Sequence, residues 1–300
     1  MRRRSWIRNW AEYLLVRAAA ATLRIGPRGW AFRLARLYTR LLDRAAPRLR
    51  RAARRNLEFA MPELTAAQRE ELIDGVFASL GRVLAALARF PSINRGNVGE
   101  WIRYEGFEHF EAAKRKGRGV LFATAHLGNW ELSAFAHALM AEPMHVVVRP
   151  LDNPLLDGWL ERRRRLSGNQ VIGKKESARK ILRALAANEA VGVLIDQNAS
   201  PQEGVFVEFF GRKACAHAGL AKLAARSGAA VIPGFALWRP EENRYVLRFC
   251  EPVAMTGDAA ADTQRLHARL EEIIREHPDQ WLWIHRRWKT RPEGEAPIYD

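Results

Sequence analysis

The sequence predicts an α/β fold: a mixed, largely parallel sheet flanked by helices, preceded by a helical, arginine-rich region. From about residue 105, short β-rich runs at 117–126, 144–150 and 190–197 alternate with helical stretches. Such alternation is typical of a parallel sheet with crossover helices. Before residue 100, apolar residues recur at helical spacing instead. We therefore expect residues 1–100 to form a helical region and residues 101–300 to form the α/β domain.

The basic charge is concentrated at one end of the chain. The 300 residues carry a formal net charge of +16, and the first 60 hold 16 arginines, no lysine and only three acids, so they account for +13 of it. A basic segment of this kind suits an anionic surface, either lipid headgroups or nucleic acid.

One of the N-terminal helices is amphipathic. Within 33–45, arginines recur at helical spacing beside an apolar stripe; they are Arg33, Arg36, Arg40 and Arg44, and the stripe is Leu34, Tyr38, Leu41 and Ala45. The helix could pack its leucines on the core, or it could lie in a membrane interface. Trp6, Trp10 and Trp30 favour the interface, because tryptophan suits the headgroup level. Residues 1–100 are therefore expected to form a membrane-associating region. The apolar segment 11–26 is interrupted by arginines and is too charged for a plain span, and no secretory cleavage pattern follows it.

The remaining elements follow in order. A helix is expected over 62–90, with Thr65 as N-cap and Gln68 completing a capping box. Further helices are expected over 129–141, with Asn129 as N-cap, and over 154–167, 176–188 and 214–227, and strands are expected over 229–238 and 244–253. The last strand should be antiparallel, because only a short turn precedes it. Cys215 and Cys250 lie in apolar surroundings and are expected to be reduced core residues.

The stretch AHLGNWE, residues 125–131, places a histidine and a carboxylate around a bend after a strand. His-x4-acid spacing is weak by itself: His126/Glu131, His137/Glu142 and His267/Glu272 all have it. The last two pairs fall in helical stretches, where five positions separate side chains by about 140°, so we expect them to be accidental and on the surface. A bend can instead let Glu131 bond His126 and fix its tautomer for proton transfer. The alternative is structural: a strand-end histidine and a glutamate favouring the helix dipole.

No other catalytic motif accompanies this pair. The sequence lacks G-x-S-x-G, H-E-x-x-H, a P-loop and G-x-G-x-x-G. We therefore expect no metal and no cofactor, and direct attack by a substrate hydroxyl or by water. Asp196, at a strand end, is expected to be structural.

Several basic side chains are candidates for phosphate or carrier contacts, with solvated surface charge as the alternative. They are Arg149, Arg164, Arg165, Arg286, Arg287 and Lys289. Arg149 is favoured because it follows a buried strand directly.

Six blocks of the sequence resemble, in order, the late acyltransferases of lipid A biosynthesis, within the lysophospholipid acyltransferase superfamily. The blocks are TAHLGNWE (124–131), VVVRPLDNPLLD (146–157), IDQN (195–198), GVFVEFFGRKA (204–214), AVIPGF (230–235) and HPDQWLWIHRRWKTRP (277–292). The resemblance covers about residues 50–299. It implies a glycerolipid acyltransferase-like fold and an enzyme at the cytoplasmic face of the bacterial inner membrane. Such an enzyme moves an acyl chain from acyl carrier protein or coenzyme A to a lipid hydroxyl.

The resemblance also implies roles for particular residues. His126 matches the general base, Glu131 its orienting acid and Arg149 a substrate-contacting arginine. The block containing Glu208, Phe209 and Phe210 matches a substrate-binding block, although these phenylalanines could equally be core. The chain has ACAH at 214–217 where the family often has threonines. The local contacts with the acceptor, but not the chemistry, are therefore expected to differ from those of the family.

Three alternative functions remain open at this point. A mannolipid acyltransferase, acting on phosphatidylinositol mannoside, or an acyltransferase of another glycolipid or of a lysolipid, shares the dyad. A lipid-ester hydrolase would release free fatty acid without an acceptor. A nucleic-acid-binding protein is allowed by the charge, but the arginines alternate with leucine and alanine at helical spacing and no nucleic-acid motif is present.

Overall fold

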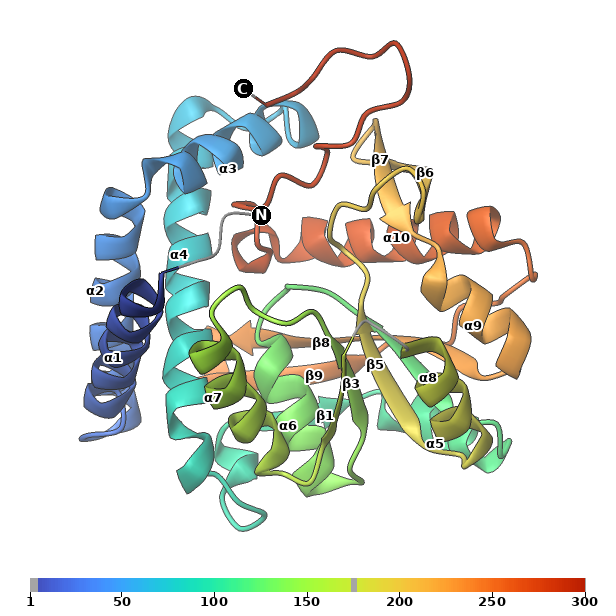
Figure 1. Ribbon diagram of the computed structural model, residues 1–300, viewed down its shortest axis with the longest axis horizontal. Coiled ribbons are helices and arrows are strands. Elements are labelled where there is room, and N and C mark those ends of the chain that lie inside the picture. The colour runs from blue at the N-terminus through green and yellow to red at the C-terminus, as the bar shows by residue number, and fades with distance from the viewer. Residues whose placement is uncertain (1–4, 174–176, 300) are drawn as a thin grey trace.

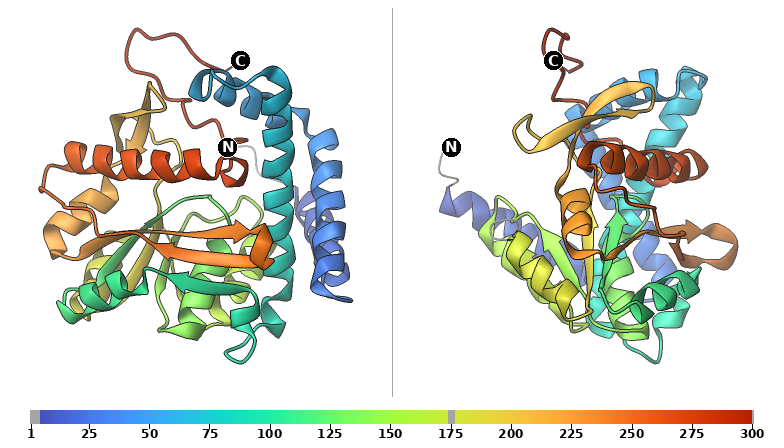
Figure 2. Two further views of the ribbon diagram at one scale, coloured as in Figure 1. Left: turned by 180° about the vertical axis from the view of Figure 1, so that it is seen from behind. Right: turned by 90° about the vertical axis from the view of Figure 1, so that its right-hand side faces the viewer.

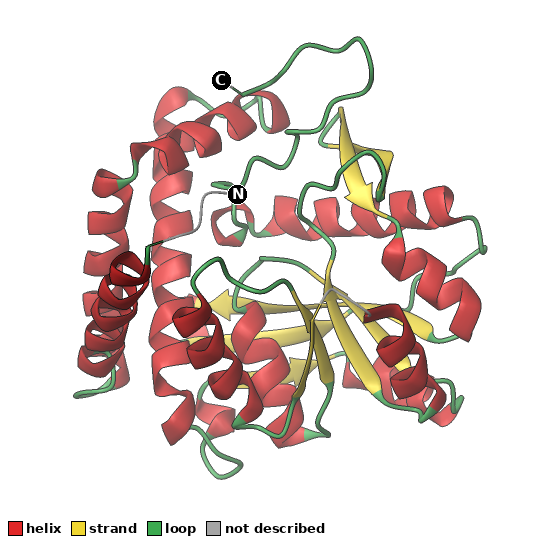
Figure 3. Cartoon of the chain, in the orientation of Figure 1, coloured by secondary structure: helices red, strands yellow, loops and turns green. Residues whose placement is uncertain are grey.

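The computed structural model describes residues 5–173 and 177–299, in which helices come first and strands alternate with helices after them (Figures 1 and 3). The helices are α1 (Trp6–Thr22), α2 (Arg28–Ala45), α3 (Pro47–Ala60), α4 (Ala66–Arg89), α5 (Phe107–Arg115), α6 (Trp130–Met140), α7 (Pro154–Arg165), α8 (Ser177–Ala186), α9 (Gly219–Ser227) and α10 (Ala259–Glu276). The strands are β1 (Ile102–Glu105), β2 (Val120–Thr124), β3 (His145–Val148), β4 (Gln170–Gly173), β5 (Ala190–Leu194), β6 (Gly204–Phe209), β7 (Arg212–His217), β8 (Ala230–Arg239) and β9 (Arg244–Phe249).

Seven of these strands form one sheet in the order β1-β9-β8-β2-β5-β3-β4. The five strands from β8 to β4 run parallel to one another, and β9 runs antiparallel to β8. The predicted α/β class and the antiparallel final strand are therefore confirmed. Because β2 and β5 are parallel neighbours, the loops at their carboxyl ends lie side by side.

The two faces of the sheet carry separate hydrophobic clusters, because side chains alternate along each strand. In β2, Leu121 and Ala123 pack on the face covered by α8, α9 and α10, whereas Val120 and Phe122 pack on the face covered by α5 and α6. Figure 2 shows α10 and α5 on opposite sides of the sheet. Both clusters also contain residues of the first 100, so the N-terminal helices share the cores of the α/β region.

Helix α4 contributes residues to both hydrophobic clusters. It begins at the predicted capping box, in which the Thr65 hydroxyl accepts from the Gln68 N–H and the Gln68 side chain accepts from the Thr65 N–H. Its first half contributes Ile73 and Phe77 to one cluster, and residues 85–88 belong to the other. The helix therefore stands along the side of the sheet (Figure 1).

Helix α2 packs on α4 through small side chains rather than through its leucines. It buries Ala31, Ala35 and Thr39. A Cβ at Gly81 of α4 would lie 3.2 Å from the backbone of Ala35, so a glycine allows the close approach. Packing through alanines leaves several larger apolar side chains of α1 and α2 exposed, whereas Phe32, Leu34 and Tyr38 pack partly against the core.

These outer side chains form an apolar surface on α1, α2 and their connection. Its exposed members are Trp6, Ile7, Trp10, Leu14, Leu15, Ile25, Trp30, Leu37, Leu41 and Leu42. Of the predicted stripe, Leu34 and Tyr38 are half-buried, whereas Leu41 is 51% exposed. Within residues 5–173 and 177–299, none of the helices combines the length and the apolar composition that crossing a bilayer requires.

Four strands, β1, β4, β6 and β7, were not predicted from the sequence. Two of them, β6 and β7, form a separate antiparallel hairpin, and residues 214–217, expected to be helical, form the end of β7. Helix α9 begins at Gly219 instead. The run ACAH has helical propensity, but pairing with β6 and contact with the core override it. Cys215 and Cys250 are buried and unpaired, as expected.

Candidate active site

The loop after β2 carries His126 and turns sharply into α6. Gly128 has φ +62°, and a Cβ there would lie 1.9 Å from the carbonyl oxygen of Ala236, so this close approach requires glycine. Asn129 is the predicted N-cap, its Oδ1 accepting from the Leu132 N–H at 3.0 Å. The bend therefore fixes the position of His126 at the carboxyl edge of the sheet.

Asp196, in the adjacent loop after β5, holds the imidazole of His126. His126 Nδ1 donates to Asp196 Oδ1 at 2.9 Å, and the His126 N–H donates to Asp196 Oδ2 at 2.9 Å. The indole of Trp281 donates to the same Oδ2 at 2.9 Å. Because the carboxylate accepts from Nδ1, the neutral ring keeps its lone pair on Nε2, which is the form a general base needs.

The charge of Asp196 also sets the proton affinity of His126. Burial of the ring lowers the pKa of His126, but the neighbouring carboxylate outweighs it and the net pKa lies above the usual value of 6.5. Burial likewise opposes ionisation of Asp196, yet His126 and the Trp281 indole hold its pKa well below the usual range. The charged carboxylate therefore favours the imidazolium that proton transfer creates.

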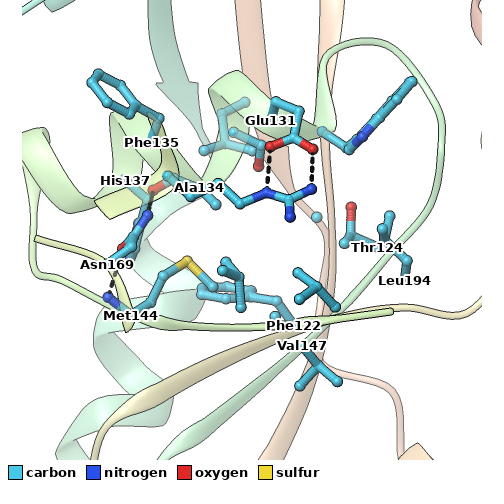
Figure 4. A pocket seen from close by; sticks show the side chains of 18 of the residues that line it. Phe122, Thr124, Glu131, Ala134, Phe135, His137, Met144, Val147, Asn169 and Leu194 are labelled. Carbon is cyan, nitrogen blue, oxygen red and sulfur yellow. Dashed lines mark hydrogen bonds and ion pairs between the residues drawn. The ribbon is translucent and has the colours of Figure 1, made fainter. Parts of the chain in front are cut away.

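Glu131 is not the hydrogen-bond partner of His126, which corrects the expected contact. It forms a two-pronged ion pair with Arg164 of α7, at 2.9 Å between Nε and Oε2 and 2.5 Å between Nη2 and Oε1 (Figure 4). Glu131 lies in the first turn of α6, and the loop geometry turns it toward α7 rather than toward the histidine. Its charge still acts on His126 through space and raises the pKa of the ring.

This ion pair lies in the wall of an apolar pocket between α6 and the sheet (Figure 4). The pocket opens to solvent, and the space along its lining, open solvent included, is about 700 Å³. Its lining includes Thr124, Trp130, Ala134, Val147 and Leu194. The ring of His126 contacts that of Trp130, with 5.0 Å between ring centroids, so the histidine lies beside the pocket.

The inner part of the pocket is aromatic. Phe122, Phe135 and Phe249 line it together with His137. His137 is 1% exposed, and burial, with Lys114 nearby, lowers its pKa to about 3. It is therefore a neutral member of the aromatic core, bonded through Nδ1 to the Tyr104 hydroxyl at 3.2 Å.

The other two His-x4-acid pairs are accidental, as predicted, but their histidines are not on the surface. His137 and His267 are both buried. Glu142 pairs with Lys114 and Glu272 with Arg269, each away from the histidine five positions earlier. Their helices belong to opposite faces of the sheet, where both histidines point into the core.

A C-terminal segment, residues 280–290, closes over the loops that hold His126 and Asp196. The Leu282 N–H donates to the His126 carbonyl at 3.0 Å, and the Gly128 N–H donates to the Gln280 carbonyl at 3.0 Å. From the sequence alone, Trp281 had no predicted role and Asp196 only a structural one. The position of Asp196 at the end of a strand could have marked it as a site residue. Its contact with His126, however, depends on which strands are neighbours in the sheet.

The remaining predicted site residues divide into exposed and buried groups. Exposed are Arg149, Arg165, Glu208, Arg286 and Lys289. Arg149 follows Val148, a pocket residue, whereas Arg165 pairs with Glu161.

The buried group corrects three expectations. Phe209 and Phe210 pack in the core against the tail tryptophans Trp281 and Trp288, so they do not wall the pocket. Arg287 is fully buried, donates to the Cys215 carbonyl and lies over the ring of Phe209, so it is not a surface contact. Phe209 is the last residue of β6, and Phe210 lies in the turn to β7 with φ +53°.

The chain is similar in sequence to known proteins. A family model described as bacterial lipid A biosynthesis acyltransferase matches residues 2–290. The lipid A biosynthesis lauroyltransferase of Escherichia coli K12 is 31% identical over 271 residues, 89% of this chain and 86% of the relative. The palmitoleoyltransferase of the same organism is 32% identical over 270 residues (88% and 87%), and its myristoyltransferase is 24% identical over 294 residues (97% and 91%).

Proposed function

Because the chain belongs to the bacterial lipid A biosynthesis acyltransferases, it is an acyltransferase, and we propose that it moves a fatty acyl chain from a thioester carrier to a hydroxyl group of a lipid A precursor or a similar glycolipid. The carrier is acyl carrier protein or coenzyme A. One observation carries the proposal: a histidine that keeps its lone pair on Nε2, oriented by a buried carboxylate, lies beside an apolar pocket.

In the proposed reaction, His126 is the general base. Its Nε2 takes the proton of the acceptor hydroxyl while that oxygen attacks the thioester carbonyl. Asp196 stabilises the imidazolium, and the thiol leaves with the proton that His126 returns. Glu131 contributes through Arg164, whose guanidinium it holds in the pocket wall, and through its charge on His126.

The pocket is proposed to hold the acyl chain, because its lining is apolar from the ion pair to the aromatic end. From Glu131 to His137 the α6 helix rises about 9 Å, which gives the pocket a depth along which chain length can be sensed. The proposal predicts that filling the pocket shortens the accepted chain.

Replacing Ala134 by phenylalanine should make the enzyme prefer a shorter donor. The new ring would occupy the pocket between its mouth and its aromatic end. We expect kcat/KM with a palmitoyl donor to fall roughly 10-fold or more relative to that with a decanoyl donor, measured in competition. Ala112→Phe, at an exposed position of α5, is the matched control. Equal losses with both donors would contradict the assignment.

The exposed basic residues near the site are proposed to contact the phosphates of the acceptor or the carrier. Arg149 is the first candidate, because it follows Val148 of the pocket. Arg286 and Lys289 are further candidates on the C-terminal segment, both exposed.

The apolar surface of α1 and α2 is proposed to lie in the cytoplasmic face of the inner membrane, with its arginines on the phosphates. Two features support this. The leucines and tryptophans there are exposed because α2 packs on α4 through alanines. In addition, Asn153, which caps α7 after the Arg149 loop, donates to the Asn9 carbonyl and to Glu12, so the proposed docking surface is tied to the site.

Attachment should therefore have two parts. Each basic residue contributes about 1 kcal/mol at an anionic surface, a contribution that salt screens, whereas apolar burial is not removed by salt. We expect high salt to loosen the protein from vesicles containing phosphatidylglycerol and detergent to release it, measured by flotation. Clean release by salt alone would show that the apolar part is absent.

The proposed function is tested by incubating the purified enzyme with a lauroyl thioester and a lipid A precursor. The expected product is the precursor heavier by one lauroyl group, with free thiol released in equal amount. Lauroyl-acyl carrier protein and lauroyl-CoA are compared as donors. A phosphatidylinositol mannoside acceptor tests the related glycolipid reaction. Release of free laurate that does not depend on any acceptor would instead identify a hydrolase.

A further inference from the structure

A second histidine, His285, lies in the C-terminal segment that closes over the site. The segment is attached by the Trp281 indole to Asp196 and by the Leu282 N–H to the His126 carbonyl. The His285 N–H donates to the Leu282 carbonyl at 3.1 Å, so the chain turns back toward the same loops. The carbonyl of His285 accepts from Asn56, a fully buried residue of α3, at 2.9 Å. Its backbone is therefore fixed from two sides.

The loop after β5 also fixes the ring of His285. The Asn198 N–H donates to His285 Nε2 at 3.1 Å, and Asn198 is two residues after Asp196. The Asn198 side chain is itself held by two bonds to Thr290, at 2.9 and 3.0 Å. One loop thus orients two histidines: Asp196 holds His126, and Asn198 holds His285.

The two rings have opposite tautomers. A backbone N–H can only donate, so His285 Nε2 carries a lone pair and the proton of the neutral ring is on Nδ1. Burial lowers the pKa of His285 to about 4, with Asp196 opposing this shift and His126 and Arg287 adding to it. His285 is therefore neutral at neutral pH. His126, by contrast, donates through Nδ1 and keeps its lone pair on Nε2.

The Nδ1–H of His285 is available to a ligand. The ring is half-buried. Nδ1 forms no hydrogen bond with another residue that the structure describes, and it is not among the unpartnered polar atoms that are fully buried. The N–H is therefore accessible and has no role in holding the fold. A neutral imidazole that keeps its proton is a hydrogen-bond donor suited to polarising a carbonyl.

We propose that His285 contacts the substrate and donates its Nδ1–H to the thioester carbonyl oxygen as that oxygen becomes negatively charged. The inference rests on the proposed function. As the hydroxyl oxygen bonds to the carbonyl carbon, the carbonyl electron pair moves to its oxygen, and His126 Nε2 takes the hydroxyl proton. The pair then re-forms the carbonyl, the carbon–sulfur bond breaks, and the thiolate takes the proton from His126. His285 keeps its own proton throughout.

The steady-state kinetics of His285 variants test whether His285 donates to the carbonyl oxygen. Removing one oxyanion donor lowers kcat by roughly 10²–10³-fold, so we expect this loss in His285→Ala and His285→Phe with KM for the lauroyl donor changed less than about 3-fold. His285→Gln can accept from Asn198 and still donate, so it should recover part of the rate. The acid limb of the pH profile should stay in place in His285→Gln, because His126 sets it. If wild-type enzyme transfers laurate and His285→Ala keeps kcat within about 3-fold, the proposal is overturned.

Two further measurements separate a substrate contact from a structural role. A lauroyl trifluoromethyl ketone, whose tetrahedral hydrate resembles the tetrahedral intermediate, should inhibit His285→Ala roughly 10²-fold more weakly than wild type. An uncleavable dodecyl thioether, which has no carbonyl oxygen, should bind both equally, whereas structural damage would weaken both ligands. In wild-type protein labelled with ¹⁵N-histidine, His285 should show protonated Nδ1 and unprotonated Nε2, and the reverse would refute the proposal without any variant. Absence of transfer by wild-type enzyme would instead count against the proposed function.

Discussion

Replacing His126 by alanine should lower kcat for acyl transfer by roughly 10²–10⁴-fold, the contribution of a positioned general base. Asp196 orients this ring beside the pocket, and the Nε2 lone pair is lost when the ring is removed. KM for the donor should change little, because the pocket lining does not include this side chain. The measurement is steady-state transfer of laurate to the lipid acceptor.

The matched control is His109→Ala, at a half-buried position of α5. Thermal unfolding of both variants shows whether the fold is intact, since removal of His126 leaves Asp196 with the Trp281 indole and the backbone N–H as partners. A folded His126→Ala enzyme with near-normal kcat would falsify the proposed mechanism.

Replacing Asp196 by asparagine should cause a loss of similar size, on the order of 10²–10⁴-fold in kcat, because an amide can donate to Nδ1 and move the imidazole proton to Nε2. The residual activity should also have a different pH dependence. His126 acts as a base only when unprotonated, so wild-type activity falls as the pH drops through a pKa above 6.5. Without the carboxylate charge this pKa falls, and the acid limb moves to lower pH.

Asp258→Asn is the control for this variant. Asp258 caps α10, and asparagine is an equally good N-cap, so activity and pH profile should be unchanged. Glu131→Gln provides a further comparison: it should weaken the hold on Arg164 but leave the tautomer of His126 intact. A larger loss in Glu131→Gln than in Asp196→Asn would restore Glu131 as the main partner of His126.

Local features were predictable from the sequence because they depend on neighbours in the chain. The capping box at Thr65 and Gln68 and the N-cap at Asn129 need only residues three positions apart. Strand–helix alternation gave the α/β class, and the short turn before residue 244 gave the antiparallel last strand. Residues 214–217 were wrongly predicted to be helical, because they pair with β6 and no local pattern in the sequence predicts that pairing.

The sequence by itself determined that the chain is an α/β protein with an arginine-rich helical start, and that His126 is at a strand end before a tight bend. Only the tertiary structure decided which acid holds the histidine. Glu131 is five residues away and turns toward Arg164, whereas Asp196 is 70 residues away and comes into contact because β2 and β5 are neighbours in the sheet. The contacts of Asn198 with His285 and of Trp281 with Asp196 depend in the same way on the packing of distant segments. A hydrogen bond is set by distance in space, which the order of residues in the chain does not fix until strands pair and helices pack.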